Sequence, residues 1–128
     1  MTTRVAVAIL RRAETVLVCQ RKKGARYELK WEFPGGKLEP NETIVQSLER
    51  ELREELSIQL NGISRIEIQT ADYSDGGTFE VAYCFVSDSS GEPANNVFQE
   101  IRWVSLEELK RLDILEGNRD FVKKLTHE

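Results

Sequence analysis

The chain has 128 residues, of which 40% are apolar and 31% charged, and its formal net charge is −4. This length fits one domain, residues 1–128, and the composition is that of a globular rather than a disordered chain. The negative charge argues against sequence-independent binding to a nucleic-acid backbone, which needs a basic patch. A small phosphorylated substrate remains compatible with it, because a bound cation can reverse the sign of a local field. No apolar run approaches the roughly 18 residues of a membrane span, and no signal-peptide core follows Met1, so we expect a cytoplasmic protein that contacts no membrane.

The first third of the chain predicts two strands and a loop. Residues 5–10 and 15–20 are apolar runs typical of buried strands, joined by a short hairpin connection. Residues 21–30 are polar and basic and predict a loop, after which Pro-Gly-Gly-Lys at residues 34–37 predicts a turn. The two cysteines, at positions 19 and 84, lie inside apolar runs, so we expect buried free thiols rather than a disulfide or a metal pair.

A helix follows. Thr43 and Gln46 have the spacing of a capping box, with a hydroxyl at the N-cap and an amide three residues later. From Ile44 to Leu56 every fourth residue is apolar, which is the row that buries one side of a helix. We expect the helix to end near Leu56, with Asn61-Gly62 marking the exit of the chain.

The second half of the chain predicts strands and then short helices. The expected elements are a strand at 63–71, a turn at 75–77, a strand at 78–87, a polar loop at 88–96, a strand at 101–104, a helix at 105–112 opened by a capping box at Ser105 and Glu108, and a last helix capped by Asn118. This order predicts an α+β fold or a three-layer α/β/α sandwich with a mixed sheet.

The predicted central helix carries the residues that indicate chemistry. Glu51, Glu54 and Glu55 are spaced i, i+3 and i+4, and at ~100° per residue they border the buried stripe instead of facing solvent. Clustered carboxylates at the rim of a core either take up protons or bind a cation, and hard oxygen ligands favour Mg²⁺, Ca²⁺ or Mn²⁺. The alternative is an ordinary solvated acidic face with arginine partners. The one histidine, His127, is close to the end of the chain and is a poor catalytic candidate, so chemistry here depends on carboxylates, a metal or both.

The surrounding pattern resembles a known family. The Nudix box consists of a glycine, five residues, a glutamate, seven residues and then Arg-Glu-aliphatic-X-Glu-Glu-X-Gly-aliphatic. At those places this chain has Gly36, Glu42, Arg50, Glu51, Leu52, Glu54, Glu55 and Ile58. The preceding run from Trp31 to Glu39 looks like the MutT-like branch of the family, and a weaker resemblance extends over nearly the whole chain.

The resemblance implies an α/β fold, the Nudix-type α/β/α sandwich, with a loop–helix–loop site for Mg²⁺ (or Mn²⁺). Carried onto this sequence, Glu51, Glu54 and Glu55 would be the metal ligands, together with the backbone carbonyl of Gly35. Arg50 would hold Glu51 in place, and Glu51 would orient or deprotonate the attacking water. The plain alternatives are a helix-surface arginine at position 50 and an ordinary turn at the glycines.

Two positions depart from the family pattern. Ser57 replaces the box glycine, which normally ends the helix in a left-handed turn that glycine adopts freely. MutT-like enzymes often have a further catalytic glutamate in the loop before the strand at 101–104. Alignment places Val97 there, with Glu100 nearby as a substitute, so the identity of the general base stays open.

The resemblance also suggests substrate-binding residues. Asn118 matches an asparagine that reads a purine, since an amide offers one donor and one acceptor, and its alternative role is that of a helix N-cap. Arg21 aligns with an arginine that contacts base or phosphate, and its alternative is a strand-end charge. Phe33 aligns with a pocket aromatic, and its alternative is core packing.

We therefore expect a Mg²⁺-dependent pyrophosphohydrolase that converts a nucleoside triphosphate, for example an oxidised purine nucleotide such as 8-oxo-dGTP, to nucleoside monophosphate and pyrophosphate. The alternatives are a Nudix hydrolase of another nucleoside diphosphate derivative (a nucleotide sugar, ADP-ribose or an RNA 5′ end) and a non-catalytic nucleotide-binding module. The partner is a small nucleotide, and the chain is a monomer or a homodimer.

Overall fold

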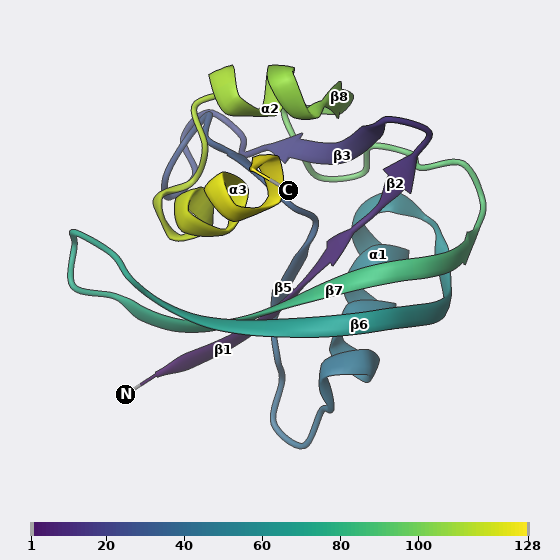
Figure 1. Ribbon diagram of the computed structural model, residues 1–128. Coiled ribbons are helices and arrows are strands. Elements are labelled where there is room, and N and C mark those ends of the chain that lie inside the picture. Colours follow the sequence, from purple (N-terminus) through teal and green to yellow (C-terminus); the bar gives the residue numbers. More distant parts are fainter. Residues whose placement is uncertain (1, 128) are drawn as a thin grey trace.

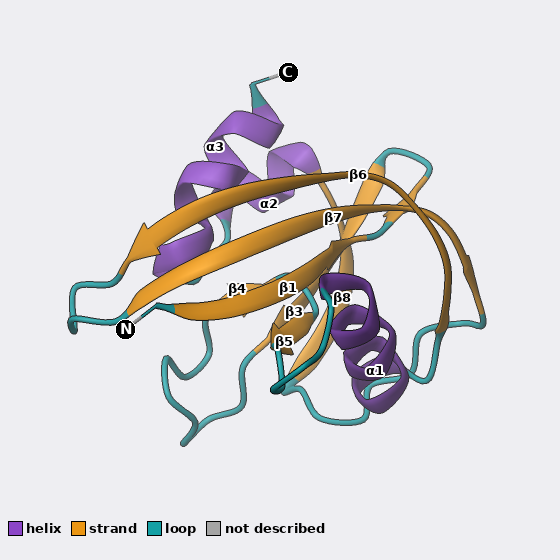
Figure 2. Cartoon of the chain, turned by 90° about the horizontal axis from the view of Figure 1, so that it is seen from below, coloured by secondary structure: helices purple, strands orange, loops and turns teal. Residues whose placement is uncertain are grey.

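The computed structural model describes residues 2–127, which form three layers (Figures 1 and 2). The strands make up the middle layer, with the long helix on one side and the two C-terminal helices on the other. In chain order the elements are β1 (Thr3–Ile9), β2 (Arg11–Arg12), β3 (Thr15–Gln20), β4 (Trp31–Glu32), β5 (Gly35–Lys37), α1 (Ile44–Leu56), β6 (Gln59–Asp72), β7 (Thr78–Ser90), β8 (Glu100–Ser105), α2 (Leu106–Arg111), the 3₁₀ turn η1 (Glu116–Asn118) and α3 (Arg119–Thr126).

The strands form two sheets. The first has the order β5-β1-β7-β6 and is mixed, because β1 runs parallel to β7 while its other pairings are antiparallel. The second is antiparallel, with β3 flanked by β2, β4 and β8. The mixed sheet and the α/β/α layering agree with the prediction. The separate second sheet was not predicted, because β2 and β4 have two residues each and leave no periodic pattern.

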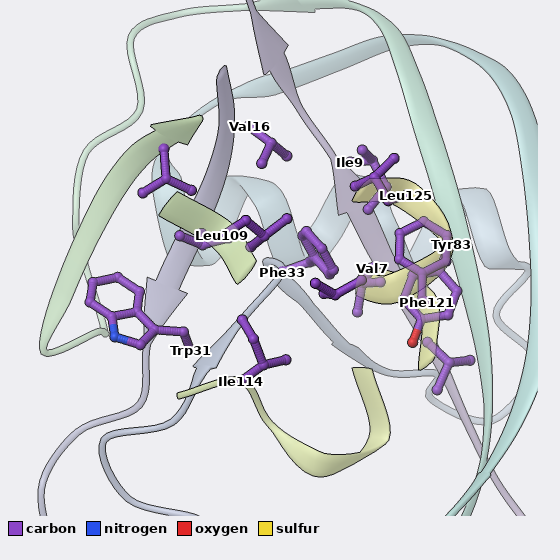
Figure 3. Close-up of a cluster of buried hydrophobic side chains, with 14 residues drawn as sticks. Val7, Ile9, Val16, Trp31, Phe33, Tyr83, Leu109, Ile114, Phe121 and Leu125 are labelled. Carbon is purple, nitrogen blue, oxygen red and sulfur yellow. The ribbon is translucent and has the colours of Figure 1, made fainter. Parts of the chain in front are cut away.

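Two apolar cores lie on opposite faces of the strands. On one face the predicted stripe of α1, represented by Leu48, Leu52 and Leu56, is fully buried against Ala6 and Ala8 of β1. The other core lies beneath α2 and α3 and contains an aromatic cluster (Figure 3). The helix that carries the candidate carboxylates is therefore fixed to the same strand, β1, that pairs with the glycines of β5.

Most of the local signals are confirmed, and two boundaries are corrected. Both capping boxes are present, at Thr43 and at Ser105, with side chain and backbone bonded reciprocally. Asn61-Gly62 was expected to mark the exit of the chain from the helix. It lies inside β6, which begins at Gln59, at a place where the register against β7 shifts at a bulge. β7 continues to Ser90, into the stretch that was predicted to be loop. Both cysteines are buried and free, as expected. Over residues 2–127, no helix combines the length and the apolarity that a bilayer crossing would require.

Candidate functional site

A pocket of about 380 Å³ opens on the side of the fold where β1, β5 and the start of α3 come together. Its lining includes the glycines of β5, Glu55, Asn118 and apolar side chains of β1 and β7. The remaining wall comes from the loop between β3 and β4. Four of the predicted site residues, Arg21, Gly35, Glu55 and Asn118, thus line one cavity.

Two adjacent glycines allow the backbone of β5 to approach its neighbours closely. Gly35 has φ +146°, and a Cβ there would collide with the backbone of Ala6. A Cβ on Gly36 would come within 2.7 Å of the Glu51 carboxyl carbon. Any side chain at either position would displace the β1–β5 pairing or the Glu51 carboxylate, so these glycines are more than the residues of a plain turn.

Arg50 joins the acidic residues of the predicted box into one network. Its Nε and Nη2 donate to the two carboxylate oxygens of Glu42 at 2.7 and 2.9 Å. Its Nη1 donates to Glu51 at 2.8 Å and approaches Glu54 at 3.5 Å. Hydrogen bonds from Arg50 hold the pKa of Glu42 down at about 2, and the carboxylates raise the pKa of Arg50 in turn. The predicted contact between Arg50 and Glu51 is present, and Arg50 is no free surface arginine.

Glu55 faces the pocket from the last turn of α1. Its Oε1 accepts a hydrogen bond from the Gly35 N–H at 3.0 Å, which ties the helix to β5. Burial first, and then the neighbouring carboxylate of Glu51, raise the pKa of Glu55 to about 9. Two carboxyl groups therefore lie side by side in a poorly hydrated place, where a cation would relieve their repulsion.

The oxygen donors of these residues are of the kind that a hard divalent cation prefers, but they do not converge on one point. In residues 2–127, no three acidic, histidine or cysteine side chains converge into a group that could hold a metal ion. The reason lies in the partners described above, because Arg50 draws Glu51 and Glu54 toward itself and Glu55 bonds to Gly35. Glu54 is the outermost of the three, with a side chain that is 60% exposed. The metal ligands thus remain a prediction, supported by carboxylate oxygens beside a glycine backbone.

The departure at Ser57 does not disturb the end of α1. Ser57 takes the left-handed conformation, with φ 57° and ψ 32°, and its N–H bonds to carbonyls of the last turn. The loop at 94–96 bonds the free carbonyls of the helix end, with Ala94 N–H bonding Leu56 and Asn96 N–H bonding Glu55. Asn96 Nδ2 also donates to the Ser57 hydroxyl at 2.9 Å. The helix therefore ends as the family pattern requires, with serine in the conformation that glycine normally supplies.

Asn118, which also lines the pocket, is buried and 4% exposed. Its side chain makes no capping hydrogen bond to α3, although the residue directly precedes that helix. Nδ2 donates instead to the hydroxyl of Tyr83 at 3.0 Å. Asn118 is thus the N-cap residue of α3 by position, as predicted, but its side chain does not cap the helix and bonds to β7 instead.

Arg21 and Phe33 have different surroundings. Arg21 lines the pocket, and its Nη1 lies 3.1 and 3.2 Å from the carboxylate oxygens of Glu32. Phe33 is 2% exposed and packs edge-on against Tyr83 and Phe121, away from the pocket lining (Figure 3). Its position favours the core-packing alternative over contact with a substrate.

Glu32 is a pocket residue that the sequence analysis did not identify. Burial raises its pKa to about 7, although Arg21 acts in the opposite direction. The sequence signal was present in the alternation of β4, where Trp31 faces one side and Glu32 the other. A strand of two residues is too short for this alternation to be recognised.

The mouth of the pocket is bridged by contacts between two loops. Arg26 Nη2 and the Tyr27 hydroxyl both donate to Asp75 Oδ2, at 2.8 and 2.7 Å. The Tyr27 ring also packs on Tyr73, with centroids 5.0 Å apart. The β3–β4 loop and the β6–β7 hairpin are thereby joined beside the pocket, whose lining includes Arg26, Tyr27 and Tyr73.

The loop before β8 contains Val97 and leads to Glu100, the two positions considered for a further general base. Val97 lines the pocket and is 44% exposed, so the aligned position does face the site but carries no acid. Glu100 is absent from the pocket lining and is paired with Arg102 at 2.7 Å. Glu55 lines the pocket and Glu51 lies against Gly36, and the identity of the general base stays a prediction.

Comparison with known proteins gives the same assignment. The NUDIX domain model matches residues 1–125. The chain is 32% identical over 122 residues to the 8-oxo-dGTP diphosphatase of Escherichia coli, which covers 94% of each chain. It is 33% identical over 100 residues to the nucleoside triphosphatase NudI of Enterobacter sp., covering 70% of this chain and 71% of that one. The solution structure of the E. coli ORF135 protein superposes with a TM-score of 0.82 at 28% identity, covering 95% of this chain and 86% of the other. Together with the pocket and the Arg50 network, these matches establish that the chain belongs to the Nudix family of hydrolases.

Proposed function

We propose that this protein is a Mg²⁺-dependent (or Mn²⁺-dependent) pyrophosphohydrolase that converts a nucleoside triphosphate, with oxidised purine nucleotides such as 8-oxo-dGTP as preferred substrates, to nucleoside monophosphate and pyrophosphate. The observation that carries the proposal is the single cavity that Glu55, the two glycines and Asn118 line together. In this proposal the phosphates of the nucleotide lie at the carboxylate and the glycines, and the base lies at Asn118. The names of the 8-oxo-dGTP diphosphatase and the nucleoside triphosphatase among the relatives support this substrate class.

In this proposal Glu51, Glu54, Glu55 and the Gly35 carbonyl hold the metal. The bound ion supplies charge neutralisation of the diphosphate and a water of lowered pKa. Arg50 orients the Glu51 carboxylate, and Glu51 positions the water or accepts its proton. Arg21 contacts the substrate from the pocket wall, where Glu32 fixes the direction of its guanidinium group.

Two other functions remain as outcomes of the test. A Nudix hydrolase of another nucleoside diphosphate derivative would use the same carboxylate end and differ in its leaving group. A non-catalytic nucleotide-binding module needs no metal-assisted chemistry, and the intact box carboxylates with their organised arginine argue against it.

The experiment is a panel of nucleotides with Mg²⁺ and identification of the products. We expect nucleoside monophosphate and pyrophosphate from a triphosphate, with 8-oxo-dGTP ahead of dGTP. If only a nucleotide sugar or ADP-ribose is turned over, the proposed triphosphate substrate is wrong and the enzyme acts on that other nucleoside diphosphate derivative. Nucleotide binding without turnover would indicate a non-catalytic nucleotide-binding module. Glu54→Gln should lower kcat by orders of magnitude. Glu49→Gln, the same change on the same helix away from the pocket and the Arg50 network, is the matched control.

A further inference from the structure

The amide of Asn118 is held by a short chain of hydrogen bonds that ends on a backbone carbonyl. Asn118 Nδ2 donates to the Tyr83 hydroxyl at 3.0 Å, and that hydroxyl donates to the carbonyl of Gly117 at 3.2 Å. Tyr83 is fully buried on β7, and Asn118 is buried at the pocket wall. The two residues are 35 positions apart, so this contact exists only in the folded chain.

The chemistry of these three groups determines which way the amide faces. A carbonyl can only accept, so the single hydroxyl proton of Tyr83 is directed to Gly117. The Tyr83 oxygen can then only accept from Asn118, which requires the NH₂ group of the amide on that side. The carbonyl of the amide, Oδ1, is consequently turned away from Tyr83.

That carbonyl oxygen faces the pocket. Within residues 2–127 no hydrogen bond uses Asn118 Oδ1, and the one buried side-chain oxygen or nitrogen left without a partner is Ser47 Oγ. Oδ1 therefore keeps some access to solvent, and the cavity that Asn118 lines provides it. An acceptor of fixed direction is thus presented to the pocket that Asn118 lines.

Packing on several sides holds the Tyr83 side chain in one position. The Tyr83 ring stacks on Phe121 with centroids 3.8 Å apart and planes 2° from parallel, and Phe33 packs against it edge-on (Figure 3). On the sheet, Tyr83 is paired with Val7 on one side and Glu67 on the other, in the middle of two ladders. Burial raises the pKa of Tyr83, so the hydroxyl keeps its proton.

We propose that Tyr83 is a positioning residue that fixes the Asn118 amide with its carbonyl toward the pocket, and that the site thereby selects purines whose facing edge carries an N–H group. This inference rests on the proposed function, in which Asn118 contacts the base. Oxidation of a purine at C8 converts N7 from an acceptor into an N–H donor. A fixed carbonyl accepts from that group, whereas an unmodified N7 would meet it acceptor to acceptor, with a loss of affinity.

The test begins with Tyr83→Phe, which keeps the ring and its stacking and removes only the hydroxyl. The ratio of kcat/KM for 8-oxo-dGTP to that for dGTP should fall by about tenfold, the loss expected for one oriented hydrogen bond, while kcat/KM for dCTP stays within about twofold. In an Asn118→Ala background the same change should leave the ratio where it is, because Tyr83 acts through Asn118. Equal losses in both backgrounds, or no loss in wild type, would overturn the proposal.

A second measurement does not depend on turnover. In nitrogen-edited NMR spectra of the unliganded protein, one side-chain amide proton of Asn118 should exchange slowly with water and lose this protection in Tyr83→Phe. Tyr27→Phe, which removes a hydroxyl bonded to Asp75 instead, is the control and should leave the protection intact. The same spectra give the Kd values of 8-oxo-dGMP and dGMP, whose ratio should move toward unity in Tyr83→Phe.

The outcomes separate the two proposals. Absence of turnover with any nucleoside triphosphate would refute the proposed function, and the Kd ratio would still test the role of Tyr83. Unchanged Asn118 protection in Tyr83→Phe would refute the hydrogen bond, and lost protection with an unchanged Kd ratio would refute its role in selectivity.

Discussion

Arg50 binds Glu42 through two nearly parallel hydrogen bonds, Nε to Oε2 at 2.7 Å and Nη2 to Oε1 at 2.9 Å, and this leaves Nη1 aimed at Glu51. Glu42 precedes α1 and Arg50 lies within it, so the pair joins the loop to the helix at the site. A planar guanidinium can bind both carboxylates at once, whereas an ammonium group cannot reproduce this geometry.

Arg50→Lys should therefore lower kcat by about 10- to 100-fold, the usual effect of removing a group that orients a metal-binding residue. Because lysine keeps the positive charge, a loss of kcat would come from the lost hydrogen-bond geometry and not from a change in the electrostatic field. Steady-state kinetics with Mg²⁺ and a nucleoside triphosphate measures it, and Arg53→Lys on the exposed side of α1 is the matched control. Wild-type turnover in Arg50→Lys would show that the bidentate pair is dispensable.

Divalent metal should stabilise the native protein, because it relieves the repulsion between Glu51 and Glu55 only when the chain is folded. At ten times the Kd of the metal the expected gain in unfolding free energy is about 1.4 kcal/mol. Melting curves with and without Mg²⁺, at matched ionic strength, measure the gain. Glu55→Gln should melt higher than wild type without metal at neutral pH and gain little from it, because buried Glu55, with a pKa of about 9, must take up a proton on folding and the amide need not. A metal-induced shift of the same size in Glu55→Gln would argue that the ion binds elsewhere.

Glu32 should make the protein less stable as the pH rises from about 4.5 to 7. Its pKa of about 7 in the folded chain lies above the ordinary value of 4.5, so in this window the folded state holds a proton that the unfolded state has lost. Arg21 faces Glu32 directly, and the charges of Glu55 and Glu32 influence each other and Cys19. Urea unfolding of wild type and Glu32→Gln across pH 4 to 8, with EDTA present, measures the difference. It should widen with pH by about 1 to 3 kcal/mol, and a constant difference would contradict the raised pKa.

Ser57 holds a left-handed conformation that costs a residue with a side chain about 1 kcal/mol relative to glycine. The hydrogen bond from Asn96 to its hydroxyl offsets this strain. Ser57→Gly should thus change the unfolding free energy little in wild type, but should raise it by about 1 kcal/mol in an Asn96→Ala background, where that bond is already lost. Denaturant unfolding of the four proteins measures both effects. Equal effects of Ser57→Gly in the two backgrounds would show that the hydrogen bond adds nothing.

Asp75 connects the two loops over the pocket mouth through Arg26 and Tyr27. Asp75→Ala should raise KM for nucleoside triphosphates several-fold with little change in kcat, because the carboxylate end of the pocket is untouched. Asp72→Ala, on the same hairpin but bonded only to Thr78, is the control. A fall in kcat at constant KM would mean that these contacts affect the chemical step instead. Because the pKa of Asp75 is held down at about 2 by Arg26, the contact should persist at every pH at which the enzyme is assayed.

The central helix could be predicted from sequence because everything that defines it is local. The capping box at Thr43, the apolar row from Ile44 to Leu56 and the placement of Glu51 beside that row all follow from helical geometry within a few turns. The family resemblance then added the glycines and Arg50, whose contacts with Glu51 the structure reproduces.

The parts that sequence reasoning missed depend on contacts between distant segments. Asn118 was expected to cap α3 with its side chain, but a buried hydroxyl on β7 competes for the amide and is 35 residues away. Phe33 was a candidate for substrate contact, yet it packs edge-on against the ring of Phe121 from α3. The arrangement of the three box glutamates also depends on hydrogen bonds made by Arg50 and by the Gly35 N–H, which a helical projection does not show.

The parallel pairing of β1 with β7 has a consequence for how the protein is made. Residues 3–9 find their partner only at residues 79–85, so the ribosome must synthesise those residues before the first strand can be closed on both sides. During that interval α1 can form its own turns, but it lacks the apolar residues Ala82 and Cys84 of β7 that belong to the core around Leu48, Leu52 and Leu56. We expect slow folding, as is usual when the closing contacts are far apart in sequence. Helix α1 is then exposed to chaperones and proteases until β7 emerges.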